Sequence, residues 1–163
     1  MLAQTFKSAA DLKLTDKQYT ALIKTLVHLE TENVKKVERA DHDSELTGGM
    51  LFGLLGNKLK ILKKQKKPIG FNLSYWLEPT KEHKCGTVGC IGGTAEWLVN
   101  ESVFSYDDSM SFSWTDHPGL KTLFNPSNVC HSTVTVNQAA RALRNFLETG
   151  HANWRKVKKQ VTD

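Results

Sequence analysis

The feature that most constrains this chain is the glycine-rich segment from Cys85 to Leu98, which holds two of the three cysteines and four of the eleven glycines. Its apolar side chains recur with helical spacing, at Val88, Ile91, Ala95 and Leu98. This spacing predicts a helix that begins just after Cys85, with Thr87 or Gly86 as its N-cap. We expect this helix to be central to the fold.

Three glycines, Gly89, Gly92 and Gly93, lie inside the predicted helix. Each costs roughly 1 kcal/mol relative to alanine in a helix interior. Close packing against another backbone would offset that cost, because glycine has no Cβ. A ligand or anion against the helix N-terminus would also offset it. We favour close packing, with the two thiols as small interior side chains.

The cysteines leave three chemical alternatives open. In a cysteine-dependent (Cys-His) enzyme, Cys85 or Cys90 would be the nucleophile, since a helix N-terminus lowers a thiol pKa, and His131 would be the base. In a small zinc-binding domain, the ligands would be Cys85, Cys90, Cys130 and His83. The Cys85-x4-Cys90 spacing is allowed for such a site, whereas Cys130 and the adjacent His131 do not form a suitable second pair, so His83 would replace one of them. A redox-sensitive Cys85–Cys90 disulfide is the third alternative.

Two stretches of the sequence carry a resemblance to a known family. Phe71-Asn72-Leu73-Ser74-Tyr75-Trp76, followed by Cys85 to Gly93, is similar to a motif of small uncharacterised bacterial and phage proteins: aromatic-Asn-hydrophobic-x-x-Trp, then C-G-T-x-x-C-[ILV]-[AG]-G opening a helix. The runs Leu123–Pro126, Val136–Leu143 and Glu148–Gly150, with Trp154, resemble the downstream segments. The resemblance covers about residues 70–155. It implies a shared fold and a bacterial or phage setting, and it implies no mechanism.

Composition narrows the class of protein. The chain has 163 residues, of which 39% are hydrophobic, and this is typical of one globular domain. No apolar run approaches the roughly 18 residues of a membrane-spanning helix, and the first residues lack a signal-peptide pattern, so we expect a cytoplasmic protein without a membrane partner. No phosphate-binding loop or dinucleotide fingerprint occurs, so we expect no cofactor.

The predicted fold class is mainly α (α+β), a single compact helical domain over residues 1–163 with one small β-hairpin. An N-terminal helical arm would span 1–68, a motif-bearing core 69–155 and a basic C-terminal tail 156–163. Helices are predicted at residues 15–39, 118–125 and 135–149, with a short one after Asn153, and a weaker helical pattern spans 51–62. The segment 71–84 is predicted to be an ordered loop and 103–114 the hairpin. The helix at 135–149 should pack beside the Cys85–Leu98 helix.

Six lysines form the strongest run of charge: Lys58, Lys60, Lys63, Lys64, Lys66 and Lys67. The net charge is +5 and the isoelectric point is near 9.1, which favours acidic partners. No aromatic side chains are interleaved with these lysines, which disfavours single-strand stacking. From this run we expect a non-catalytic binding or regulatory protein whose basic face docks an acidic partner, either a host protein surface or nucleic acid.

Overall fold

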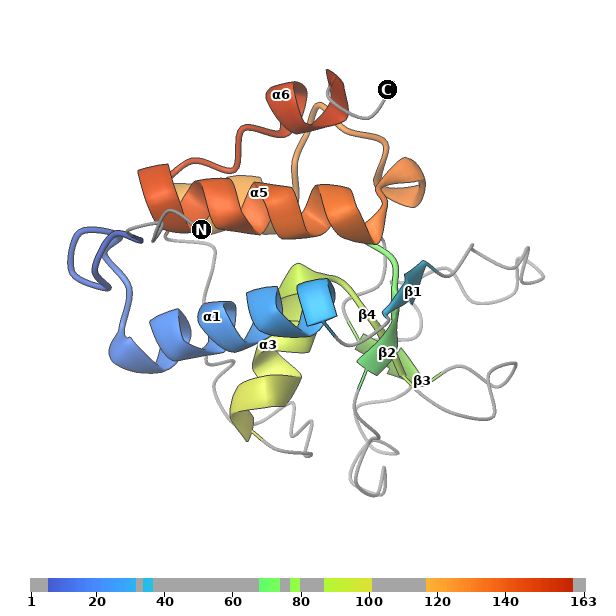
Figure 1. Cartoon of the computed structure of the whole chain (residues 1–163), viewed down its shortest axis with the longest axis horizontal. Coiled ribbons are helices and arrows are strands. Elements are labelled where there is room, and N and C mark those ends of the chain that lie inside the picture. The colour runs from blue at the N-terminus through green and yellow to red at the C-terminus, as the bar shows by residue number, and fades with distance from the viewer. Residues whose placement is uncertain are drawn as a thin grey trace, which may run out of the picture.

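The computed structural model describes residues 6–31, 34–36, 68–73, 77–79, 87–100 and 117–159. Helices dominate this part of the chain, with a small sheet at one end of the helices (Figure 1). The elements are α1 (Asp16–Thr31), β1 (Lys35–Lys36), β2 (Pro68–Phe71), β3 (Leu77–Pro79), β4 (Thr87–Gly89), α3 (Ile91–Asn100), α4 (Pro118–Phe124), a 3-10 turn (His131–Thr133), α5 (Val136–Thr149) and α6 (Trp154–Lys159). The predicted class, mainly α with a small β component in one compact domain, is confirmed.

Helix α1 begins with the predicted capping box. The Thr15 hydroxyl accepts from the Gln18 amide at 3.2 Å, and the Gln18 side chain accepts from the Thr15 amide at 3.0 Å. The helix ends at Thr31, so the predicted extension to residue 39 is wrong. Lys35 and Lys36 leave the helical pattern because they pair, in parallel, with Gly70 and Phe71 of β2.

The start of α3 also differs from the prediction. Thr87–Gly89 is strand β4, and neither Thr87 nor Gly86 is the N-cap, because β4 pairs with β2 on one side and β3 on the other. The Cys90 carbonyl accepts the first helical bond, from the Thr94 amide at 2.9 Å. Gly89 therefore lies outside the helix. Gly92 and Gly93 lie in its first turn, where glycine costs less than in a helix interior.

The sheet has four short strands in the order β1-β2-β4-β3. Strands β1, β2 and β4 are parallel neighbours, and β3 is antiparallel to β4. The segment predicted as a loop from residue 71 to 84 thus contains the end of β2 and all of β3. The predicted hairpin at 103–114 and the weaker helical pattern at 51–62 lie outside the described residues.

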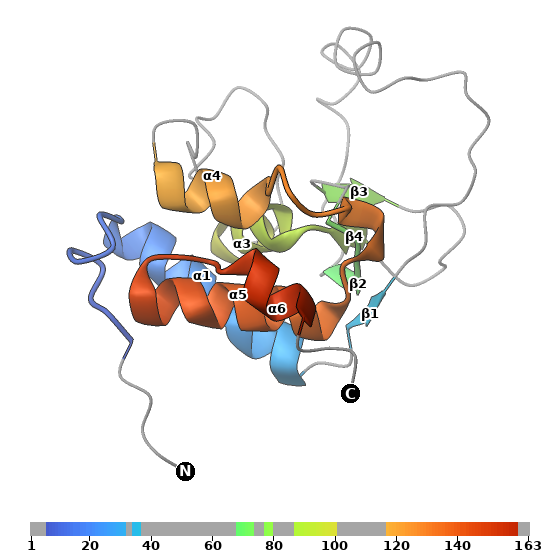
Figure 2. The same ribbon diagram turned by 90° about the horizontal axis from the view of Figure 1, so that it is seen from above.

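The C-terminal helices follow their local signals. Helix α4 has Pro118 at its first position, and α5 has the predicted capping box of Thr135 and Gln138. Gly150 ends α5 at φ 85°, a left-handed conformation that favours glycine. Helix α6 follows Asn153, and its Trp154 and Val157 are buried. In Figure 2, α6 lies across α5 and α4 runs beside them.

The core lies where α1 packs on both α3 and α5 (Figure 1). Leu22, Ile91, Ala95 and Leu143 are fully buried there. Helix α5 was predicted to pack beside the cysteine-bearing helix; among the described residues, α1 and, less extensively, α4 contact both α3 and α5. No helix among the described residues is long and apolar enough to cross a bilayer.

Candidate functional site

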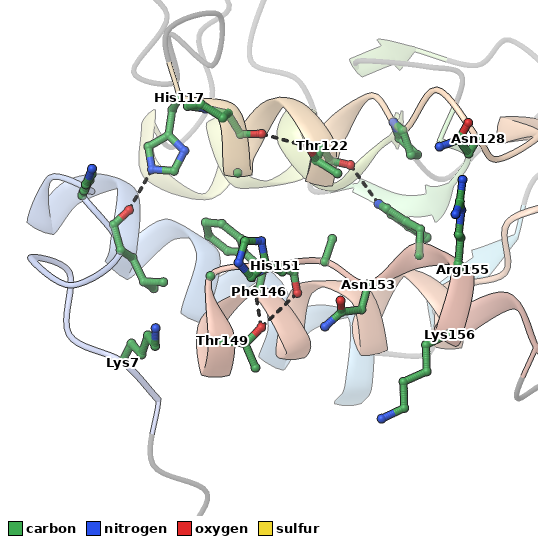
Figure 3. Close-up of a pocket in the computed structure, with 18 of the residues that line it drawn as sticks. Lys7, His117, Thr122, Asn128, Phe146, Thr149, His151, Asn153, Arg155 and Lys156 are labelled. Atoms are coloured by element: carbon green, nitrogen blue, oxygen red, sulfur yellow. Dashed lines mark hydrogen bonds between the residues drawn. The ribbon is translucent and has the colours of Figure 1, made fainter.

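An open groove of about 980 Å³ lies between three segments that are far apart in the sequence (Figure 3). One wall is the N-terminal segment 7–13, the second is α4 with the loop that follows it, and the third is the end of α5 with the start of α6. Its polar lining includes Lys7, Asp11, Lys13, His117, Asn128, His151, Asn153, Arg155 and Lys156.

The N-terminal wall is a compact turn. The Asp11 carboxylate accepts from both the amide and the hydroxyl of Ser8, and these bonds lower the pKa of Asp11. Lys13 has φ 55°, which turns the chain sharply before α1. The Lys7 amide donates to the Leu147 carbonyl at 2.9 Å and so attaches the segment to α5. Lys7 and Lys13 are both exposed along this wall.

His117 joins the N-terminal wall to α4. Its Nδ1 accepts from the Leu120 amide at 3.1 Å, which caps the helix, and its Nε2 lies 2.7 Å from the Leu12 carbonyl oxygen. Because the amide must donate to Nδ1, the proton is on Nε2, which donates to the carbonyl. The ring also meets Phe146 edge-on, with centroids 6.1 Å apart. The imidazole therefore holds two walls together.

Helix α4 approaches α5 closely at Gly119. A Cβ at this position would lie 2.7 Å from Cε2 of Phe146 and 3.3 Å from the Gly150 carbonyl oxygen. Phe146 is fully buried and has little room to move. Glycine at position 119 thus sets the spacing between the two walls.

The third wall is held in place by hydrogen bonds between side chains and backbone groups. The Thr149 hydroxyl accepts from the His151 amide, and the Asn145 side chain donates to the Ala152 carbonyl. The Trp154 indole donates to the Thr122 carbonyl at 3.0 Å, so α6 is attached to α4. These contacts place Arg155 and Lys156 on the groove, where both are exposed.

The groove is strongly basic. Four cationic side chains line it against one carboxylate, that of Asp11, whose Oδ2 is already hydrogen-bonded to Ser8. Within the described part of the chain, the side chains of Lys13, Arg155 and Lys156 make no hydrogen bond or ion pair. Like charges gathered in a concave site create a positive potential that favours an anionic ligand.

The residues predicted from the cysteine motif divide between the core and the surface. Cys90 is 3% exposed, and its Sγ lies 3.4 Å from the Gly93 amide nitrogen, so the thiol accepts at the N-terminus of α3. Burial raises the pKa of Cys90 to about 11, despite the opposing hydrogen bonds from the Gly93 and Gly92 amides. The amides at the helix N-terminus lower this pKa as expected, but desolvation is the larger effect, so the net shift is upward and not the lowering that a nucleophile needs.

Cys130 is exposed instead, in the loop before the 3-10 turn. Its Sγ lies 3.3 Å from the Ser132 hydroxyl, and this contact lowers the pKa of Cys130. The neighbouring His131 has its Nε2 3.1 Å from the Pro126 carbonyl oxygen, to which it donates. In the described ranges, no three His, Cys, Asp or Glu side chains are grouped as metal ligands. His83, Cys85 and the lysines from Lys58 to Lys67 lie outside those ranges.

The sequence does contain part of the signal for the groove. The sequence shows the basic helix that follows Asn153. It also shows His117 before Pro118 and the helix end at Gly150. What the pattern does not show is that residues 7–13 meet residues 117–128 and 149–156. Comparisons with protein-family models, curated proteins and solved structures found no match.

Proposed function

We propose that this chain is a non-catalytic binding or regulatory protein of bacterial or phage type, and that its basic groove docks an acidic partner, either a host protein or a nucleic acid. The observation that carries the proposal is the set of four exposed cations around one groove. The bacterial or phage setting rests on the cysteine-glycine motif alone. In this proposal the lysines from Lys58 to Lys67 provide a second basic face.

The alternative of a cysteine-dependent enzyme has less support where Cys90 is the nucleophile; Cys85, the other candidate, lies outside the described residues. Cys90 is buried and its pKa is raised to about 11, so the thiolate that a nucleophile needs is scarce at neutral pH. Alkylation of the native protein separates the two classes. If the protein is a non-catalytic binding protein, Cys85 and Cys90 should both be inert, whereas fast reaction of either thiol at neutral pH would favour an enzyme.

A charge-reversal pair tests the groove. The groove variant is Lys13→Glu/Arg155→Glu, and the matched control is Lys24→Glu/Arg141→Glu, which reverses one lysine and one arginine on exposed positions of α1 and α5 outside the groove. Binding of fluorescent polyglutamate and of a thymidine 20-mer is measured by anisotropy at low salt. We expect at least a tenfold loss for the groove variant and less than threefold for the control.

Equal losses in the two variants would mean that only net charge matters, and the proposal would fall. The second face has its own test, a Lys60/Lys63/Lys64/Lys67→Glu variant. If this variant binds both probes as well as the unaltered protein, the lysine run has no part in docking.

A further inference from the structure

We infer that the groove binds an extended, acidic segment of a polypeptide rather than nucleic acid. This inference rests on the proposed function and names the partner of that same groove. It depends on the size of the groove, on the side chains between its cations, and on the kind of aromatic surface that it presents.

The size of the groove suits a single chain. Its volume of about 980 Å³ is at the upper end of the roughly 300–1,000 Å³ of ligand pockets. Duplex DNA is usually bound by elements that protrude into its own grooves, the wider of which is about 12 Å across. A concave site walled by α4 and α6 does not offer such an element. A short extended peptide or a few nucleotides would fit.

The cations lie toward both ends of the groove. Figure 3 shows Lys7 at one end of the groove and Arg155 at the other. A ligand that meets both ends must therefore carry anionic groups separated along its length. Glutamate or aspartate side chains on an extended chain supply them, and the arginine fork matches a carboxylate with two parallel hydrogen bonds.

Two amide side chains come from opposite walls. Asn128 follows α4 and Asn153 precedes α6, and both are exposed and line the groove. Neither side chain makes a hydrogen bond within the described residues. An asparagine amide both donates and accepts, as a peptide bond does, so this pair suits the backbone of an extended chain. A phosphodiester backbone only accepts hydrogen bonds, so it would engage the NH2 donors of these side chains and leave their oxygen acceptors unused.

The aromatic side chains of the groove do not suit bases. Sequence-tolerant binding of single strands uses exposed rings on which successive bases stack. Phe146 and Trp154 line the groove but are 0% and 4% exposed, and the Trp154 indole N–H is already bonded to Thr122. Among the described lining residues, His151 is the exposed ring and His117 is half-buried, so the groove offers one exposed ring, enough for one base.

The test compares two probes that carry five negative charges each. One is a blocked, fluorescent decapeptide of alternating glutamate and serine, and the other is a fluorescent thymidine hexamer. A glutamine-serine decapeptide is the neutral control. The decisive variant is Asn128→Ala/Asn153→Gly, which keeps the charge of the groove and, with glycine, the left-handed backbone of position 153 at φ 52°. We expect the peptide to bind more tightly than the hexamer, and this variant to weaken the peptide at least fivefold and the hexamer less than twofold.

The charge variant Lys13→Glu/Arg155→Glu distinguishes failure of the proposed function from failure of the inferred partner. If it weakens the hexamer, and the hexamer binds more tightly than the peptide, the groove is a nucleic-acid site: the inference is overturned and the proposed function stands. If it weakens neither probe, the groove does not dock anions and both fall. Tight peptide binding that the asparagine variant leaves unchanged also overturns the inference. Circular dichroism of each variant confirms that the fold is kept.

Discussion

Two regions of the molecule differ in the side chains that form them. One is the interior where α1 packs on α3 and α5, and the other is the groove between the N-terminal segment, α4 and α6. The interior contains fully buried apolar side chains such as Leu22, Ile91 and Leu143, and a thiol that burial keeps neutral. The groove gathers four exposed cations, and three of them, Lys13, Arg155 and Lys156, make no ion pair among the described residues. Stability should therefore depend on the first region and ligand binding on the second.

The largest expected effect is in the interior. Replacing Leu143 by alanine removes a fully buried side chain of α5, which should lower the free energy of unfolding by about 2–5 kcal/mol. The control is Val27→Ala on α1, where the side chain is 51% exposed and the change should stay within about 0.5 kcal/mol. Urea denaturation followed by circular dichroism measures both. Equal effects would erase the contrast between core and surface.

The second effect depends on pH. The folded state holds the pKa of Cys90 at about 11, above the ordinary value of 9.0, by keeping the neutral thiol buried. Stability from this group is therefore complete below pH 9 and is lost as the pH rises from 9 to 11. Two pKa units correspond to about 3 kcal/mol.

Denaturation at pH 7, 9 and 10.5 under reducing conditions should show a steeper loss for the unaltered protein than for Cys90→Ala. The matched variant Cys130→Ala removes an exposed thiol and should keep the steep loss. If Cys90→Ala declines just as steeply, other groups account for the alkaline dependence, and the interior holds no thiol that burial keeps neutral.

A smaller effect is expected at the join between the two regions. His117→Ala removes both the cap of α4 and the hydrogen bond to the Leu12 carbonyl. Loss of a helix cap costs about 1 kcal/mol, and the second bond adds about 1 kcal/mol. Asparagine is a favoured N-cap, so His117→Asn should recover the cap. An asparagine variant as unstable as the alanine variant would show that the link to Leu12, and not the cap, is what matters.

The smallest effect on stability is expected in the groove. Lys13→Glu/Arg155→Glu changes two exposed side chains without hydrogen-bond partners in the described part of the chain, so the free energy of unfolding should move by less than about 0.5 kcal/mol per site. The same variant should lose at least tenfold in polyanion binding. A large loss of stability here would mean that the cations support the fold, and the division between the two regions would fail.

Sequence signals at helix ends correctly predicted the start of α1, α4 and α5 and the end of α5. The capping boxes at Thr15 and Thr135, the proline of α4 and the left-handed Gly150 depend on residues within four positions of one another. The errors occur where distant pairing decides. Thr87–Gly89 carries a helical apolar pattern but forms β4, because β2 is placed beside it.

The groove could not be predicted from the sequence pattern either, because it too depends on contacts between segments that are far apart in the sequence. Its cations come in pairs, Lys7 with Lys13 and Arg155 with Lys156, and neither pair is dense enough to suggest a site. Folding brings the two pairs to one concavity. The interior position of Cys90 was predicted and is confirmed, but spacing alone does not show how far burial of the thiol raises its pKa.

The attachment of the Lys7 amide to Leu147 has a practical consequence for mapping experiments. Because the two sides of one concavity come from opposite ends of the described chain, removing residues 6–13 or residues 153–159 should abolish the same interaction. A deletion series would then indicate two independent recognition motifs where the proposed site is a single composite groove. Point substitutions, which leave both ends in place, avoid that misreading.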